Sequence, residues 1–313
     1  MVVGKSRVRR CVRASYRIAL CVLLTAAFTV LIYVSRQCVR ALAFDQFVIP
    51  TGSMSPTLIP GDRVLVDKTI LGARLYTSLD FPPGGGELEC VRLRGRRRVR
   101  RNDILVFNFP HHGGRISFVI NNVYCKRCVA LPGDTLWTEH GFYRNSNHGG
   151  VLGVEEEQRR FSMTPDSLLP REILATYPYD PGLPYTTKDM QRTYIPRRGD
   201  VVELTPRMAA YYRMPLEWET GCRVTWDSGT GGVYADGKPL RSHTFLHDYY
   251  FMAGDNVMDS SDSRNWGLVP GEYIVGVVTR ITYSRDRLTG RLRKERTWKN
   301  VAAGGDGTVI MEQ

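Results

Sequence analysis

The sequence predicts a mostly β protein that follows one N-terminal membrane-spanning helix, and three observations support this fold class. The stretch Ile18–Ser35 carries no charged residue, and its length fits a transmembrane helix. Beyond it, short β-branched and aromatic runs such as DILVFNF and YIVGVVTRITY alternate with Gly-Asp, Asn-Asp and Asp-Gly pairs, a pattern typical of antiparallel strands. Helical periodicity is scarce in that part of the chain.

The apolar stretch is predicted to be a retained membrane anchor. As a helix it would span roughly 27 Å, close to the hydrocarbon core of a bilayer. Six basic residues precede it, whereas two, Arg36 and Arg40, follow it before the next turn. This asymmetry places residues 1–17 in the cytoplasm as a basic tail and the rest of the chain outside. A signal peptide cleaved after Ala43 is the alternative, but the apolar run exceeds the usual length of roughly 7–15 residues.

The basic composition suits a nucleic acid or an anionic membrane surface as partner, and the apolar stretch favours the membrane. The 313 residues carry a formal net charge of +12, and the pI is about 9.5. Seven arginines fall within Arg92–Arg101, which is either a solvated loop or a contact with anionic lipid headgroups. The run lacks the interleaved aromatic residues of a nucleic-acid platform, so no nucleic-acid partner is predicted. The seven cysteines imply no dense disulfide framework.

The chain beyond the anchor is predicted to contain a β core, an insert and a tail. The β core comprises residues 44–138 and 245–290. Residues 139–244 differ in composition, with an acidic EEEQ run and Tyr-Pro pairs, and are predicted to form an inserted subdomain. Within the insert, VYADGKPL indicates a β-hairpin with its turn at Asp236 and Gly237. Residues 291–313 are predicted to be a polar C-terminal tail.

A Gly-Ser-Met turn soon after the anchor offers a candidate nucleophile, Ser53. A serine hydroxyl needs a base to remove its proton, and none of the six histidines lies in a triad spacing that we can identify. Lys126 lies in the apolar strand VYCKRCVAL. Burial there would lower the pKa of the amine and allow it to act as a general base. A solvent-facing lysine paired with an acid is the alternative.

No metal or cofactor is predicted, although two residue pairs have suggestive spacings. His243 and His247 lack a third ligand. Cys125 and Cys128 lie in one strand, where three residues span about 10 Å and the two side chains point to opposite faces. This geometry is incompatible with a disulfide bond, and both cysteines are expected to be small apolar fillers.

Three sequence blocks follow the anchor in order: IPTGSMSPTL, YCKRCVALPGD and MAGDNVMDSSDSRNWGLVP. Together they resemble the bacterial type I signal peptidases, or leader peptidases, which are membrane-anchored serine proteases with a Ser-Lys dyad. With the flanking strands, the likeness extends over Phe44–Trp137 and Phe245–Tyr283. It implies a signal-peptidase-like catalytic domain of two antiparallel β regions, interrupted here by the insert.

The resemblance also implies roles for individual residues. Ser53 would be the nucleophile and Lys126 the base. Thr51, where the family more often has serine, would stabilise the oxyanion together with the N–H of Ser53. The supporting residues would be Ser260, which bonds the lysine amine, and the ion pair of Asp262 and Arg264. The substrate pockets would be lined by Phe47, Ile49, Pro50, Met54, Leu58, Tyr124 and Cys125.

One departure from the family pattern concerns the third block. Val257 stands where the family usually has arginine, which removes an expected ion-pair partner near Asp255 or Asp259. This difference leaves the dyad intact but puts the support from that block in question.

The implied function is the removal of signal peptides from exported preproteins by cleavage after small residues at positions −1 and −3. The implied location is the cytoplasmic (inner) membrane, with a single span and the catalytic domain on the outer side. The expected partners are exported preproteins and the lipid bilayer. A membrane-tethered peptide-binding module of the same fold without catalysis is the alternative. A self-cleaving peptidase of the repressor type is disfavoured by the anchor and the third block.

The charge asymmetry around Ile18–Ser35 predicts that a protease added to intact cells will digest a C-terminal tag and spare an N-terminal tag. Immunoblotting of both tags measures this topology. Loss of the N-terminal tag by processing after Ala43 would contradict it and would support a cleaved signal peptide.

Overall fold

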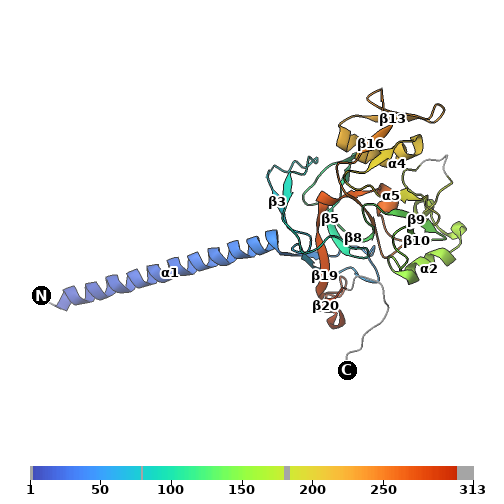
Figure 1. Ribbon diagram of the computed structural model, residues 1–313. Coiled ribbons are helices and arrows are strands. Elements are labelled where there is room, and N and C mark those ends of the chain that lie inside the picture. Colours follow the sequence, from blue (N-terminus) through green and yellow to red (C-terminus); the bar gives the residue numbers. More distant parts are fainter. Residues whose placement is uncertain (1–2, 79, 180–183, 302–313) are drawn as a thin grey trace.

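The computed structural model describes residues 3–78, 80–179 and 184–301, with side chains described from Tyr16 onward. Helix α1 (Val3–Leu42) projects away from the folded domain (Figure 1). Its apolar part, Tyr16–Leu42, is long enough to cross a membrane and is not buried against the domain. The prediction of one N-terminal apolar helix is therefore confirmed. The helix continues beyond Ser35 because no glycine or proline interrupts the next seven residues.

The domain is built on an antiparallel sheet of eight strands, which confirms the predicted mostly β fold. The strand order is β1-β2-β19-β5-β8-β17-β18, and β20 also pairs with β19. The bounds of these strands are Phe44–Val48 for β1, Asp62–Asp67 for β2, Ile104–Asn108 for β5, Val123–Ala130 for β8, Tyr249–Ala253 for β17, Val269–Pro270 for β18, Ile274–Ser284 for β19 and Lys299–Asn300 for β20.

Strand β5 lies inside the protein because both of its faces are apolar. Every one of its residues is buried. Leu105 and Phe107 contribute to one hydrophobic core, whereas Ile104 and Val106 contribute to a second core that also holds Met54. Alternate residues of a strand point to opposite faces, so the continuous run ILVF fills a core on each side of the sheet. Such a strand is centrally placed, and its neighbours β8 and β19 are held in register by it.

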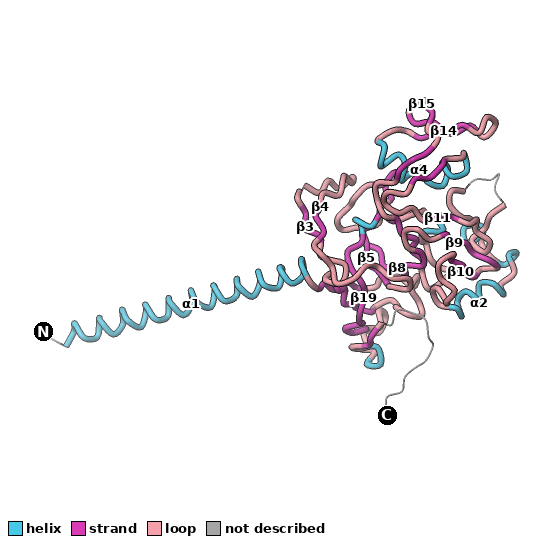
Figure 2. The backbone as a smooth tube through the Cα atoms, viewed as in Figure 1, coloured by secondary structure: helices cyan, strands magenta, loops and turns pink. Residues whose placement is uncertain are grey.

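Smaller elements surround this sheet, and most of the shorter helices fall between residues 155 and 220 (Figure 2). The additional strands are β3 (Arg74–Tyr76), β4 (Cys90–Arg92), β6 (His111–His112), β7 (Arg115–Ile116), β9 (Thr135–Glu139), β10 (Phe142–Asn145), β11 (Thr193–Tyr194), β12 (Val201–Glu203), β13 (Val224–Asp227), β14 (Gly232–Ala235), β15 (Lys238–Pro239) and β16 (Ser242–Thr244). The helices are α2 (Glu155–Met163), α3 (Arg171–Leu174), α4 (Pro206–Thr220) and α5 (Ser263–Trp266), with the 3₁₀ turns η1 (Asp166–Leu168), η2 (Gly271–Tyr273) and η3 (Lys294–Arg296).

The region predicted as an insert, residues 139–244, contains more helix than the sequence pattern indicated. Helix α4 is capped by Thr205, whose side chain accepts a hydrogen bond from the N–H of Met208, and it ends at Gly221 in the left-handed conformation. Its buried residues include Tyr211 and Tyr212. Because apolar and aromatic residues cover much of its circumference, the helix lacks the one-sided period by which helices are recognised. The boundaries of the insert stay a prediction. The β9–β10 hairpin begins before the predicted boundary at Glu139 and ends after it.

The hairpin predicted within the insert is confirmed. Ala235 pairs with Lys238 across a turn formed by Asp236 and Gly237. Both turn residues have positive φ angles, 46° and 76°, as a two-residue hairpin turn of this kind requires. The Asp-Gly pair satisfies this requirement with little strain.

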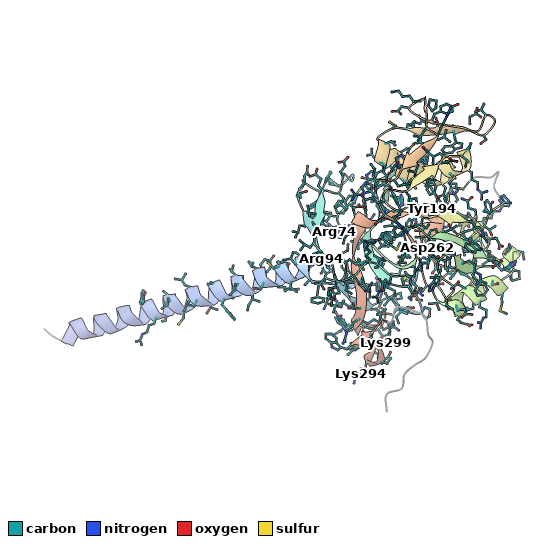
Figure 3. The ribbon with its side chains drawn as sticks, viewed as in Figure 1. Arg74, Arg94, Tyr194, Asp262, Lys294 and Lys299 are labelled. Atoms are coloured by element: carbon teal, nitrogen blue, oxygen red, sulfur yellow. The ribbon has the colours of Figure 1, made fainter. Side chains whose placement is uncertain are left out.

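Four of the seven arginines in the arginine-rich loop bond to other groups of the domain, so the loop is not freely solvated. Arg92 donates to backbone carbonyl oxygens, including that of Ile274 at 2.6 Å. Three more arginines form ion pairs, Arg96 with Asp67, Arg97 with Asp103 and Arg101 with Asp134. The exposed members Arg94, Arg98 and Arg100 form no ion pair within the described part of the chain. Arg94 lies on the side of the domain where α1 enters (Figure 3), and contact with lipid headgroups stays a prediction for these three.

The described part of the predicted C-terminal tail packs against the domain. Strand β20 pairs with β19, and Val301 packs against the second core. In η3, Arg296 donates to both carboxylate oxygens of Asp62, at 3.0 and 2.6 Å. Asp62 is fully buried. Burial alone would raise the pKa of this carboxyl, but the bonds from Arg296 hold it below its ordinary value. Residues 302–313 lie outside the described residues.

Replacing Arg296 by Met should destabilise the domain, because it leaves the buried Asp62 carboxylate without its cation. The expected loss in the free energy of unfolding is roughly 3 kcal/mol, seen as a lower Tm of the full chain in detergent. Asp62 in the wild type has a lowered pKa, so its contribution is present at neutral pH and is lost as pH falls below the ordinary carboxyl range. The loss of stability at acid pH should therefore be smaller in the variant. Lys294→Met, an exposed change in the same turn, is the control, and equal Tm values for the two variants would contradict the prediction.

Candidate active site

Ser53 lies on a tight loop between β1 and β2 that is fixed at both ends. Backbone hydrogen bonds join Ile49 to Asp62 and Gly61 to Ile49, so the loop leaves and re-enters the sheet at one place. The N–H of Ser55 donates to the carbonyl of Gly52, which closes a turn around Ser53. Met54 is almost fully buried in the second core. A buried side chain directly after Ser53 holds the loop down and leaves the serine hydroxyl on the cleft side.

Lys126 comes from the middle of β8 and points its amine at this hydroxyl. The Lys126 Nζ lies 2.6 Å from Ser53 Oγ and 3.1 Å from Ser260 Oγ, and it donates hydrogen bonds to both. The lysine is only 3% exposed. Its backbone pairs with Leu105 of the buried strand β5, so the amine is positioned by the centre of the sheet. The alternative of a solvent-facing lysine paired with an acid is wrong.

The surroundings of Lys126 favour the neutral amine. Burial lowers the pKa of Lys126 below its ordinary value, and the Asp262 carboxylate opposes this shift. Lys126 forms no ion pair among the described residues. A neutral amine has a lone pair and can accept a proton from a hydroxyl within hydrogen-bond distance. The pair therefore has the geometry of a nucleophile and its base.

The third sequence block packs directly on the Ser53 loop. The N–H of Asn256 donates to the carbonyl of Ser53 at 3.1 Å. At Gly254, an added Cβ would lie 2.0 Å from Ser260 Oγ and 2.5 Å from the Ser53 carbonyl oxygen. Only glycine allows this close approach. Gly254 thus brings Ser260 and Ser53 to the same amine.

Asp262 and Arg264 form a fully buried pair behind Ser260. The Arg264 guanidinium donates two hydrogen bonds of 2.8 Å to the two Asp262 oxygens. Asp262 also caps α5 and accepts a bond from the N–H of Gly254 at 2.9 Å. Figure 3 shows Asp262 within the body of the domain. The pair holds the backbone on both sides of Ser260, which agrees with the predicted supporting position.

The concern raised by Val257 is resolved for Asp255 by Arg127, a residue that the sequence did not single out. Asp255 receives two hydrogen bonds of 2.6 Å from Arg127, and both side chains are buried. Arg127 follows Lys126 on β8, so an arginine at position 257 is not needed to neutralise Asp255. Val257 is instead buried, and its carbonyl accepts a bond from Arg264 at 3.0 Å. The expected loss of an ion pair was therefore wrong for Asp255, whereas Asp259 forms no ion pair with the described residues.

A cleft of about 430 Å³ opens beside the two residues. Five predicted pocket residues line it, namely Ile49, Pro50, Met54, Tyr124 and Cys125, together with Thr51, Ser53 and Lys126. Thr51 is exposed, and its hydroxyl lies 3.5 Å from Ser53 Oγ. Two predicted lining residues are not at this cleft. Leu58 is fully buried in the second core beneath it, and Phe47 packs against that core from β1.

Gly52, Val123, Asp259 and Ser261 also line the cleft, and the sequence analysis missed them. Val123 could have been found, because it lies two residues before Cys125 in a strand and so shares its face. Asp259 and Ser261 flank Ser260, and their proximity to the cleft follows from the tertiary packing of the third block.

Comparison with known proteins now identifies the family. Residues 20–150 and 228–283, more than half of the chain, match the family described as "Signal peptidase, peptidase S26". The chain belongs to this family. Membership makes it a signal peptidase of the serine protease class, and the resemblance carried by the three blocks is confirmed.

Individual signal peptidases from several bacteria are similar to this one. Signal peptidase I of Buchnera aphidicola subsp. Schizaphis graminum is 26% identical over 268 residues, covering 83% of this chain and 72% of that protein. Signal peptidase I of Helicobacter pylori is 27% identical over 246 residues, covering 74% and 71%. Signal peptidase I of Rickettsia bellii reaches 35% identity over 109 residues, 34% of this chain. The family match leaves out residues 151–227, which lie within the predicted insert.

The cysteine and histidine pairs with suggestive spacings in this signal peptidase are held by core packing or by carboxylate partners. Cys128 belongs to the first core and Cys125 packs against the second, so the two thiols lie on opposite faces of β8, as predicted. Burial raises the pKa of Cys125 to about 12, which keeps the thiol protonated and unreactive. His243 pairs with Glu219 at 2.6 Å and His247 with Glu272 at 2.9 Å, so each histidine has its own carboxylate partner.

Proposed function

We propose that this protein is a membrane-anchored endopeptidase that removes signal peptides from exported preproteins with a Ser53–Lys126 dyad. The observation that carries the proposal is the 2.6 Å separation of Lys126 Nζ and Ser53 Oγ at the wall of a cleft. Family membership supports the activity. The apolar helix α1 supports the anchor, and the basic residues before it favour a cytoplasmic N-terminus in the inner membrane, with the cleft on the outer side.

The proposed reaction begins with neutral Lys126, which takes the proton of Ser53 Oγ as this oxygen attacks the scissile carbonyl carbon. The carbonyl becomes a tetrahedral oxyanion, which the N–H of Ser53 and the hydroxyl of Thr51 can stabilise. Within the described residues, the Ser53 N–H has no other acceptor. The ammonium of Lys126 then gives its proton to the leaving amine, and the C–N bond breaks. Water, deprotonated by the same amine, hydrolyses the acyl-enzyme and frees Ser53.

Ser260 and the pair behind it act as positioning groups in this scheme. The Ser260 hydroxyl accepts one hydrogen bond from Lys126 and so directs the amine toward Ser53. Asp262 and Arg264 neutralise each other, so the pair fixes the backbone without placing a free carboxylate on the lysine. A free carboxylate in contact would raise the pKa of Lys126 and favour its inactive, protonated form.

The substrate can bind by adding a strand to β8. Strand β17 pairs with β8 from Arg127 to Ala130, and the partner of residues 123–126 on the other edge is β5. One edge of this part of β8 is therefore open toward the cleft, and an extended peptide can use its backbone hydrogen bonds. Alternate side chains of such a peptide point to the same face. Positions −1 and −3 would both meet the apolar wall of Ile49, Met54 and Cys125, which favours small residues.

Detergent-purified full chain should cleave a panel of preprotein reporters that carry Ala-x-Ala before the cut. Ser53→Ala should lower kcat by at least about 10³-fold while the protein stays folded, because only a hydroxyl is lost. Lys126→Met and Lys126→Arg should both be inactive, since arginine stays protonated and cannot accept the serine proton. Ser55→Ala, a hydroxyl deletion on the same loop, is the control. Reporter binding without Ser53-dependent cleavage would show a binding module instead of a peptidase.

The lowered pKa of Lys126 also predicts the pH dependence of this activity. The active form is the neutral amine, so kcat/KM should increase about tenfold per pH unit below the lysine pKa and level off above it. The midpoint should lie below that of a free lysine, near 10.4, because burial disfavours the ammonium. The residues lining the cleft include no histidine among those described. A midpoint near 6.5 that a histidine substitution abolishes would contradict the lysine mechanism.

A further inference from the structure

We propose that a second cleft, walled in part by Glu172, Ile173, Tyr179 and Thr187, binds the first residues of the mature segment behind the scissile bond and prefers positive charge there. The inference rests on the function proposed above. It gives a role to the part of the chain that the family match leaves out. The observations that carry it are the position of the cleft, the attachment of its outer wall and the charges on its surface.

The second cleft adjoins the first across a narrow ridge formed by the third block. It has a volume of about 360 Å³, within the usual range of small binding pockets. Asp259 and Ser261 line both clefts, whereas Ser260 between them lines the second. Ser260, whose hydroxyl bonds Lys126, is therefore part of the wall of the second cleft, while Lys126 lines the first. The two clefts can be occupied by one continuous chain that crosses the ridge near the dyad.

The direction of the substrate follows from the order of residues along β8. Val123, Tyr124 and Cys125 line the first cleft ahead of Lys126, and they would contact the residues before the cut. The leaving amine must lie within hydrogen-bond distance of Lys126 to receive its proton. The first substrate residue after the cut therefore lies beside Lys126 Nζ, and this atom is 3.1 Å from Ser260 Oγ. At about 3.3 Å per extended residue, its second and third residues reach the second cleft.

The outer wall of the second cleft is firmly attached to the catalytic loops. The N–H of Tyr177 donates to the Arg264 carbonyl at 2.7 Å, and the Thr176 hydroxyl donates to the same oxygen at 3.0 Å. Thr187 ties the wall together by donating to the carbonyls of Ile173, at 2.6 Å, and Leu174, at 2.9 Å. Because the bonds from Thr176 and Tyr177 run to the backbone of Arg264, the wall and the buried Asp262–Arg264 pair form one unit. A wall held in this way can contact substrate at a fixed distance from the dyad.

The charges on the second cleft favour a cationic occupant. Glu172 and Asp259 line it and are exposed, and neither forms an ion pair with any described residue. Arg264 also lines it, but its guanidinium is neutralised by Asp262 at 2.8 Å. The neighbouring Arg171 is not a lining residue. A lysine or arginine shortly after the cut would therefore meet two uncompensated carboxylates, whereas an acidic residue there would be repelled.

The test uses purified full chain and matched reporter peptides with one Ala-x-Ala cleavage region. One peptide ends at the first residue after the cut, and a second continues with four more neutral residues. Two further peptides of the longer length carry Lys or Glu at the second and third positions after the cut. We expect the longer neutral peptide to have a KM at least threefold lower than the short one. The Lys peptide should exceed the Glu peptide in kcat/KM by about fivefold, and this ratio should fall toward one in 1 M salt.

Two variants assign the charge preference to this wall. Glu172→Gln should reduce the ratio of kcat/KM between the Lys and Glu peptides. Glu203→Gln removes another exposed carboxylate from β12, outside the cleft, and should leave the ratio unchanged. Ile173→Trp should fill the cleft and raise KM for the longer peptides more than for the short one.

Ser53-dependent cleavage with no effect of length or charge would overturn this inference and leave the proposed function standing. Failure to cleave any peptide would instead overturn the proposed function. Equal ratios in Glu172→Gln and Glu203→Gln would also overturn the inference, because the preference would then reflect the overall charge of the protein.

Discussion

The burial of the Lys126 amine between two hydroxyl groups is the constraint on which the rest of the site depends. An ammonium in such a place is costly unless a carboxylate compensates it, and here its hydrogen-bond partners are the hydroxyls of Ser53 and Ser260. The neutral amine is favoured as a result. The lysine can stay there because its backbone belongs to the centre of the sheet, where strand β5 is buried on both faces. The stability of the sheet thus keeps the amine in an unfavourable environment.

Neighbouring charged groups are arranged to leave this amine uncompensated. Arg127, the next residue on β8, pairs with Asp255, and Asp262 pairs with Arg264. Each carboxylate has a guanidinium of its own, held by two short hydrogen bonds. Such pairs contribute less to stability than their distances suggest, because both ions are desolvated. Their effect here is specific: two negative charges are fixed close to Lys126 without either forming an ion pair with it.

The close approach of two loops completes the arrangement. Gly254 allows Ser260 and the Ser53 carbonyl to lie where a Cβ would otherwise be, and Asn256 joins the same loop to Ser53. The segment around Thr176 and Tyr177, from the region that the family match omits, is bonded to the carbonyl of Arg264. A region that the family match leaves out is therefore coupled to the backbone of the site. This attachment is the physical basis for expecting it to contact substrate.

The sequence by itself determined the parts of this protein that depend on local order along the chain. The uncharged run specified the apolar helix, and the alternating and continuous apolar runs specified strands such as β5. That Ser53, Lys126 and Ser260 are neighbours was implied only by the resemblance of the three blocks to type I signal peptidases. The apolar residues around Lys126 already implied a lowered pKa. These inferences work because helix and strand periods, and the burial they imply, are properties of adjacent residues.

The tertiary structure decided which distant groups meet. It paired Asp255 with Arg127 and Asp62 with Arg296. It divided the arginine run between internal ion pairs and exposed side chains. It also buried Leu58 below the cleft that this leucine was expected to line. It also formed α4 from a segment without a one-sided period. A charged side chain can pair with any acid that packing brings within about 4 Å, and no local period encodes that choice. The partners therefore became known only once the strands were in register.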